Sequence, residues 1–73
     1  MGNRAKTRST GLAMRIRDAR TSAGLTQRGL AIRLKKAEST VRSWELGKSE
    51  PDIKTAVELA DLLSVSLDQL LRE

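Results

Sequence analysis

The chain has 73 residues, enough for one small domain, which would bury only about 60% of its unfolded surface. It has no cysteine and no histidine, which excludes disulfides, most zinc sites and the commonest general base, and no cofactor is expected. The net charge of +5 is uneven, because residues 1–50 carry 12 Lys/Arg and 4 Asp/Glu whereas residues 51–73 carry 2 and 5.

A basic N-terminal part and an acidic C-terminal part are typical of a protein that binds a polyanion with one side of its surface. A soluble surface with a chance asymmetry of charge is the alternative. No apolar run approaches the roughly 18 residues of a membrane span, and the basic N-terminus lacks the apolar segment of a signal peptide. The sequence therefore predicts a cytoplasmic protein with no membrane partner.

Residues 1–11 are polar and basic and show no hydrophobic periodicity, so they are predicted to form a flexible arm. Its cations are Arg4, Lys6 and Arg8. Such an arm can lie along nucleic-acid phosphates or reach into a minor groove. A solvated tail without function, or residues left from expression, is the alternative.

The pattern predicts a first helix over residues 12–23, with Leu12, Ile16 and Ala19 on one face. Gly24 stands where a glycine commonly ends a helix. The domain proper is predicted to cover residues 12–73.

Two short amphipathic runs follow, over residues 27–34 and 38–46. Thr26 is a good N-cap for the first run, and Gly47 ends the second. Trp44 is expected in the core, because it is a single large residue at helical spacing from an apolar valine. Helices this short are unstable alone, so they are predicted to pack crosswise as a helix-turn-helix whose second helix can enter a DNA major groove.

Pro51 and Asp52 introduce a fourth helix, and Ser66 with Gln69 is a capping-box pair for a short fifth helix. The predicted fold is an all-α, compact five-helix bundle without internal repeats. The fourth helix is expected to bury an apolar face, which consists of Ile53, Val57, Ala60 and Leu63, widened by Ala56, Leu59 and Leu62.

Several fragments now resemble a known family when taken in order: TQ..LA, STV..WE.GK, a proline, and LADLLSVSLDQLL. Together they resemble the DNA-binding domain of the lambdoid phage repressor and Cro helix-turn-helix family. The resemblance covers residues 12–71. It implies a double-stranded DNA operator as the partner.

The resemblance also implies site residues. It places the base-reading residues on the second helix of the motif, at Glu38, Ser39, Thr40, Arg42 and Ser43. Arginine can bind guanine through two hydrogen bonds, glutamate can accept from cytosine, and serine can contact either kind of base. A first-turn acid that only complements the helix dipole is the alternative for Glu38. The resemblance implies phosphate contacts for Gln27 and Lys48, and Thr26 and Arg28 beside Gln27 are assigned the same role. Lys35 and Lys36 depart from the family pattern and are assigned to phosphate because two cations at the turn would lie close to the DNA backbone.

The family typically keeps a partly buried Arg–Glu pair at the positions of Arg20 and Glu45, so these two residues are assigned a structural role. The sequence departs from the family at the turn, where Lys35 replaces the usual glycine and Ala37 replaces a capping Ser or Thr. The turn is therefore expected to differ in geometry. Glu50 and Asp52 place acid where relatives often carry phosphate contacts, which suggests modest affinity for DNA.

The leading hypothesis is a sequence-specific transcriptional regulator, a small Cro-like repressor or restriction–modification controller, that binds a two-fold symmetric operator as a homodimer. Surplus apolar residues near the C-terminus make Leu62 and Leu71 candidates for the dimer surface. The alternative is an antitoxin or adaptor that uses the same fold mainly to bind a toxin or another regulatory protein. An enzyme is disfavoured because no nucleophile–base pair is present.

Overall fold

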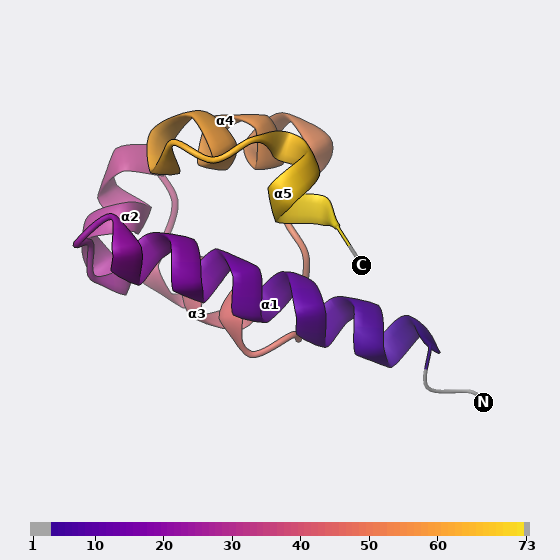
Figure 1. Ribbon diagram of the computed structural model, residues 1–73. Coiled ribbons are helices and arrows are strands. Elements are labelled where there is room, and N and C mark those ends of the chain that lie inside the picture. Colours follow the sequence, from indigo (N-terminus) through magenta and orange to yellow (C-terminus); the bar gives the residue numbers. More distant parts are fainter. Residues whose placement is uncertain (1–3, 73) are drawn as a thin grey trace.

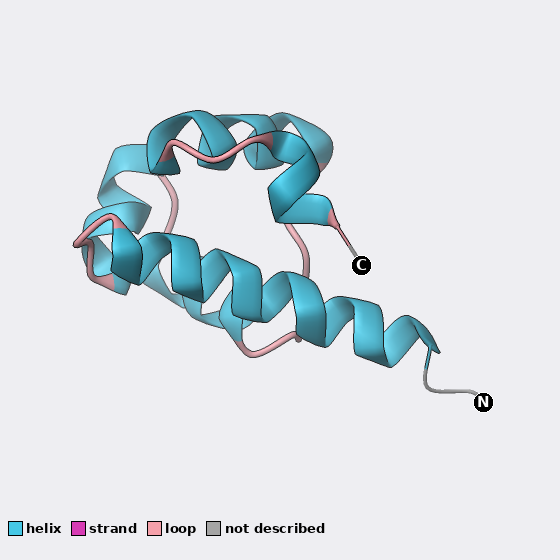
Figure 2. Ribbon diagram, viewed as in Figure 1, coloured by secondary structure: helices cyan, strands magenta, loops and turns pink. Residues whose placement is uncertain are grey.

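The computed structural model describes residues 4–72 of the chain, and the side chains of residues 11–72. Its helices are α1 (Arg4–Ser22), α2 (Gln27–Leu34), α3 (Glu38–Glu45), α4 (Ile53–Leu63) and α5 (Leu67–Leu71). In Figure 1, α1 runs along one side of the molecule, α4 and α5 face it, and α2 with α3 completes the bundle. Figure 2 shows short loops between the helices and no strand over the described range, so the prediction of an all-α five-helix fold is confirmed.

Every helix contributes to one core. The largest fully buried side chains come one from each helix: Ile16, Leu30, Val41, Leu59 and Leu70. Burying a side chain of this kind contributes about 1.5–3 kcal/mol to stability. Trp44 belongs to the same cluster with 4% of its surface exposed, which confirms its predicted core position.

Most helix ends agree with the capping residues found in the sequence. Asp52 caps α4 by accepting a hydrogen bond from the backbone N–H of Thr55, at 2.9 Å. Ser66 and Gln69 form the complete capping box of α5, with both hydrogen bonds at 2.9 Å. Gly24 and Gly47 adopt positive φ angles of 76° and 75° at the second position after α1 and α3, as glycines at helix C-termini commonly do.

The predicted start of the first helix at Leu12 was wrong, because α1 begins at Arg4. Residues 4–11 contain no proline, and extending an existing helix costs far less than nucleating one. Once Leu12 and Ile16 are packed in the core, helix formation therefore proceeds backwards through Gly11, and the start of α1 extends beyond the other helices in Figure 1. Residues 1–3 of the predicted arm lie outside the described residues.

The predicted apolar face of α4 was partly wrong. Ile53 and Val57 are exposed, by 67% and 45%. Apolar residues occupy two adjacent stripes of this helix, and only one stripe can face the core. The stripe with small residues is the buried one, because small side chains let α4 approach its neighbours closely; it consists of Thr55, Ala56, Leu59, Ala60 and Leu63.

The turn between α2 and α3 keeps the left-handed geometry that a glycine would adopt, so the expectation of a different turn was wrong. Lys35 has φ 60° and ψ 41°. Its backbone N–H bonds the carbonyl of Ile32 at 3.1 Å, and that of Lys36 bonds the carbonyl of Ala31 at 2.9 Å. These bonds close the end of α2 and offset a conformational cost of about 1–2 kcal/mol.

Candidate nucleic-acid interface

The outer face of α3 is polar, while its inner face belongs to the core. Val41 and Trp44 are buried, whereas the other residues from the start of α3 to Ser43 are exposed or half-buried. Of the five predicted base-reading residues, Glu38, Ser39 and Arg42 are exposed. Thr40 and Ser43 are half-buried. The structure thus gathers all five on one short helix that presents hydrogen-bonding groups outward.

A hydrogen-bonded ion pair fixes α3 to the rest of the domain. Arg20 of α1 donates to both carboxylate oxygens of Glu45, from Nε at 2.6 Å and from Nη2 at 3.1 Å. Arg20 also donates to the backbone carbonyl of Leu25 at 2.8 Å. The side chains of Arg20 and Glu45 are only 12% and 4% exposed. They therefore hold the helices together from inside and do not form part of the outer face.

The Gln27 side chain joins the same network. Its amide Nε2 donates to Glu45 Oε1 at 3.0 Å, which links the first residue of α2 to the last residue of α3. Thr26 accepts a hydrogen bond from the backbone N–H of Gly29 at 2.9 Å. Within the described part of the chain, the backbone N–H groups of Gln27 and Arg28 have no protein acceptor. The start of α2 therefore offers free donors that favour an anion such as a DNA phosphate.

Arg42 and Glu38 form an ion pair along the surface of α3. Arg42 Nη2 lies 3.5 Å from Glu38 Oε2, and the two side chains are 54% and 44% exposed. Glu38 also occupies the first turn of α3, where Ala37 provides no side-chain cap and a negative charge complements the helix dipole. An exposed pair at this spacing contributes only about 0.3–0.5 kcal/mol, so a stronger partner can displace it.

The loop after α3 is fastened to the helix. The backbone N–H of Lys48 bonds the carbonyl of Ser43 at 2.9 Å, and that of Gly47 bonds the carbonyl of Trp44 at 3.1 Å. In addition, Ser49 Oγ donates to Ser43 Oγ at 2.8 Å. Lys48 is exposed beside this fastened end. Sequence reasoning missed Ser49, since a lone serine in a loop gives no signal until the loop is folded onto the helix.

The remaining cations predicted to contact phosphate have different surroundings. The pKa of the Asp52 carboxyl is lowered mainly by hydrogen bonds from Thr55. Lys36 is exposed and lies close enough to Asp52 for its positive charge to lower this pKa further. Lys35 is exposed and lines a shallow hollow with the carboxylates of Glu58 and Asp61 in α4. The contact of Lys35 with phosphate therefore has weaker support than that of Lys48.

The N-terminal arm was predicted to supply three cations for contact with DNA. Arg4, Lys6 and Arg8 lie in the first turns of α1, and their side chains lie outside the described residues.

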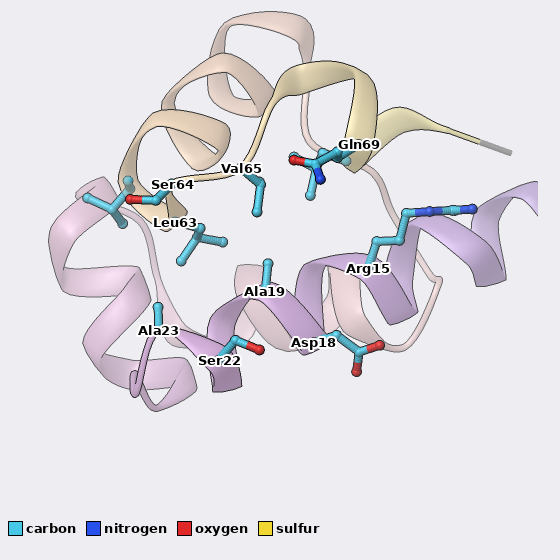
Figure 3. A pocket seen from close by; sticks show the side chains of 11 residues that line it. Arg15, Asp18, Ala19, Ser22, Ala23, Leu63, Ser64, Val65 and Gln69 are labelled. Atoms are coloured by element: carbon cyan, nitrogen blue, oxygen red, sulfur yellow. The ribbon is translucent and has the colours of Figure 1, made fainter.

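The two dimer candidates differ in exposure. Leu62 is half-buried against the core, whereas 39% of Leu71 is exposed on α5. Leu62 also lines a hollow of about 610 Å³ between α1 and the α4–α5 connection, where Ala19, Val65 and Gln69 face one another (Figure 3). No residue that lines this hollow comes from α2 or α3, so it is separate from the polar face of α3.

The described residues contain no group of three His, Cys, Asp or Glu side chains placed to hold a metal ion. None of their helices combines the length and the apolar character needed to cross a membrane.

Comparison with known families agrees with this geometry. The sequence pattern of the helix-turn-helix family matches residues 16–70, which include all of α2, α3 and α4. The chain belongs to the Cro/C1-type helix-turn-helix family. This family consists of DNA-binding transcriptional regulators and not of enzymes.

Three relatives from Bacillus subtilis (strain 168) are similar to this Cro/C1-type chain. The SPbeta prophage-derived HTH-type transcriptional regulator YonR is 40% identical over 58 residues, which are 80% of this chain and 54% of YonR. YqaE is 37% identical over 57 residues, which are 78% of this chain and 49% of YqaE. ImmR is 35% identical over 60 residues, which are 82% of this chain and 47% of ImmR. YqaE and ImmR are also HTH-type transcriptional regulators. The chain thus spans about half the length of these relatives.

Proposed function

We propose that this domain is the sequence-specific DNA-binding part of a transcriptional regulator, and that α3 enters the major groove. The observation that carries the proposal is the outer face of α3, where Glu38, Arg42 and Ser43 present donors and acceptors on a helix held by a buried ion pair. An α-helix fits the major groove, and these side chains match the groups displayed on base edges.

Phosphate contacts would surround α3 and fix its register on the duplex. The free N–H groups at the start of α2 and the exposed ammonium of Lys48 lie on the two segments that flank α3 in sequence. Contacts of this kind position a protein on DNA without reading its sequence. The net charge of residues 1–50 supports the same orientation, with the acidic α4 and α5 away from the DNA.

We further propose that the protein acts as a homodimer on an operator with approximate two-fold symmetry, in the manner of a small Cro-like repressor. Two copies of α3 would enter successive major grooves on one face of the duplex, about 10 bp apart. The names of the three relatives support transcriptional regulation. The exposed Leu71 supplies an apolar contact for the dimer.

The experiment that tests this function is selection from a random double-stranded DNA pool at about 0.15 M salt, because nonspecific phosphate binding dominates at lower ionic strength. An enriched pair of inverted half-sites about one helical turn apart would support the whole proposal. A single half-site would retain DNA recognition and reject the dimer. No enrichment would reject sequence-specific binding and favour an antitoxin or adaptor whose main partner is a toxin or another regulatory protein.

A further inference from the structure

The hydrogen bond between Ser49 and Ser43 joins a loop residue to a candidate base-reading residue. The two Oγ atoms lie 2.8 Å apart, and Ser49 is the donor. Ser43 is half-buried at the edge of the outer face of α3, while Ser49 is exposed two residues beyond Gly47. The two residues are six positions apart, so the bond exists only because the chain turns back on itself.

The end of α3 makes this turn rigid. Gly47 adopts φ 75°, and the backbone bonds from Gly47 and Lys48 to the last carbonyls of α3 close the helix. Ser43 consequently holds the loop at two points: its carbonyl accepts from Lys48 and its hydroxyl accepts from Ser49. Ser49 is thereby held against α3.

This contact has a consequence for the Ser43 side chain. A serine hydroxyl rotates freely unless a partner fixes it, and it offers one donor and two acceptor positions. Since Ser49 occupies one acceptor position of Ser43, it fixes the Oγ atom and leaves the proton of Ser43 able to donate outward. Purine N7, guanine O6 and thymine O4 are the acceptors that such a donor meets in a major groove.

We propose that Ser49, which lies outside the recognition helix, is a positioning residue for base recognition: it orients the Ser43 hydroxyl toward an acceptor on a base edge. The inference rests on the proposed function, because it requires α3 to lie in the major groove. It assigns a loop serine a part in specificity that differs from the phosphate contact expected of its neighbour Lys48.

The test uses the site that the wild-type protein selects from the random pool, together with its single-base-pair variants. Ser43→Ala first identifies the base pair whose discrimination depends on Ser43. Ser49→Ala should reduce discrimination at that same base pair by about three- to tenfold, the scale of one displaced hydrogen bond. The double variant should lose no more than Ser43→Ala alone, and Ser49→Thr, which keeps the hydroxyl, should retain the preference.

Three controls separate this role from others. Affinity for random DNA and its salt dependence should be unchanged in Ser49→Ala, and so should the melting temperature. Ser22→Ala, which removes an exposed serine hydroxyl from α1, should leave discrimination at every position unchanged.

The outcomes are distinct. Unchanged discrimination in Ser49→Ala would overturn the inference, and so would an equal loss of affinity for specific and random DNA, which would make Ser49 a phosphate contact. If the wild-type protein selects no site at all, the proposed function fails and this inference fails with it. If the wild type selects a site that Ser49→Ala reads equally well, only this inference fails.

Discussion

Arg42 and Lys48 bring positive charge to two different parts of the proposed interface. Arg42 lies on the outer face of α3 and Lys48 in the loop behind it. Arg42→Ala should weaken binding to the selected site by about 1–3 kcal/mol and blunt discrimination at one base pair. Lys48→Ala should instead weaken selected and random DNA together and reduce the salt dependence. Titrations of both DNAs at several salt concentrations measure both effects.

Arg72→Ala is the matched control for Arg42→Ala. Arg72 is 64% exposed and pairs with Asp68 at 3.4 Å across one helical turn, as Arg42 does with Glu38 at 3.5 Å. The Arg72→Ala variant should bind the selected site and random DNA as the wild type does. An equal loss on both DNAs in Arg42→Ala would assign Arg42 to the phosphates and reject its base-reading role.

Arg20 is predicted to stabilise the fold and not to contact DNA. Arg20→Met leaves the Glu45 carboxylate, only 4% exposed, without its cation and should cost about 3–5 kcal/mol. Urea unfolding, followed by the fluorescence of the single tryptophan, measures this loss. Arg20→Met/Glu45→Met should recover much of it, because neither charge is then stranded.

Arg17→Met provides the control on the same helix. Arg17 is exposed, so its replacement should change the free energy of unfolding by no more than about 0.5 kcal/mol. A similar small change in Arg20→Met would show that the Arg20–Glu45 pair contributes little to the fold.

At the scale of the elements, the left-handed ends of α2 and α4 store strain. Lys35 and Ser64 have φ angles of 60° and 59°, and both are exposed. Glycine relieves about 1–2 kcal/mol of strain but loses more chain entropy on folding. Lys35→Gly and Ser64→Gly should therefore each stabilise the domain by about 0.5–1 kcal/mol, which raises the melting temperature by several degrees.

Lys36→Gly separates this effect from a general effect of glycine. Lys36 follows Lys35 directly and is not among the described residues with positive φ. Glycine there should lower the melting temperature, since it adds flexibility without relieving strain. A decrease in all three variants would contradict the account of strain.

The cap of α4 should make stability depend on pH. The hydrogen bonds from Thr55 hold the pKa of Asp52 below its ordinary value of 3.8. A carboxyl whose pKa is lowered by folding stabilises the native state at pH values above its unfolded pKa, and this stabilisation is lost as the pH falls through the folded pKa. Asp52→Asn keeps a capping oxygen without the charge. The wild type should therefore melt higher than Asp52→Asn at neutral pH, and the difference should vanish on acidification.

The elements show what the sequence can predict. Caps such as Thr26 and Asp52, and the glycine after α3, act through neighbouring residues, so they located four of the five helices closely. Residues 4–11 show no hydrophobic periodicity that would mark them as helix, and the orientation of α4 depends on which of two apolar stripes meets the other helices. Both predictions were wrong: α1 extends past its packed residues by helix propagation, whereas tertiary packing decides which face of α4 is buried.

The candidate site also has features that the sequence predicted and features that it did not. The sequence and the family resemblance indicated which residues lie on α3, because the register of a helix fixes its outer face. They gave no indication that Gln27 donates to Glu45 or that Ser49 bonds Ser43, since those contacts depend on where a neighbouring helix and loop come to rest. The assignments to bases and phosphates stay predictions.

At the scale of the whole molecule, the proposed dimer can be tested at Leu71. Leu62 packs partly against the core, so a charge there would damage the fold as well as an interface. Leu71 is 39% exposed, so Leu71→Glu should leave each monomer folded, with a cooperative melting transition. Sedimentation equilibrium over a range of concentrations should give the mass of a dimer for the wild type and of a monomer for Leu71→Glu.

The same variant should change how DNA is bound. With one α3 per molecule, Leu71→Glu should still recognise a half-site but should lose the gain in affinity that comes from binding two half-sites together. Ile32→Glu, at a residue 65% exposed on α2, is the control and should remain dimeric. If Leu71→Glu keeps both the dimer mass and the affinity for paired half-sites, the two copies meet through another surface, and the two-fold arrangement must be built without α5.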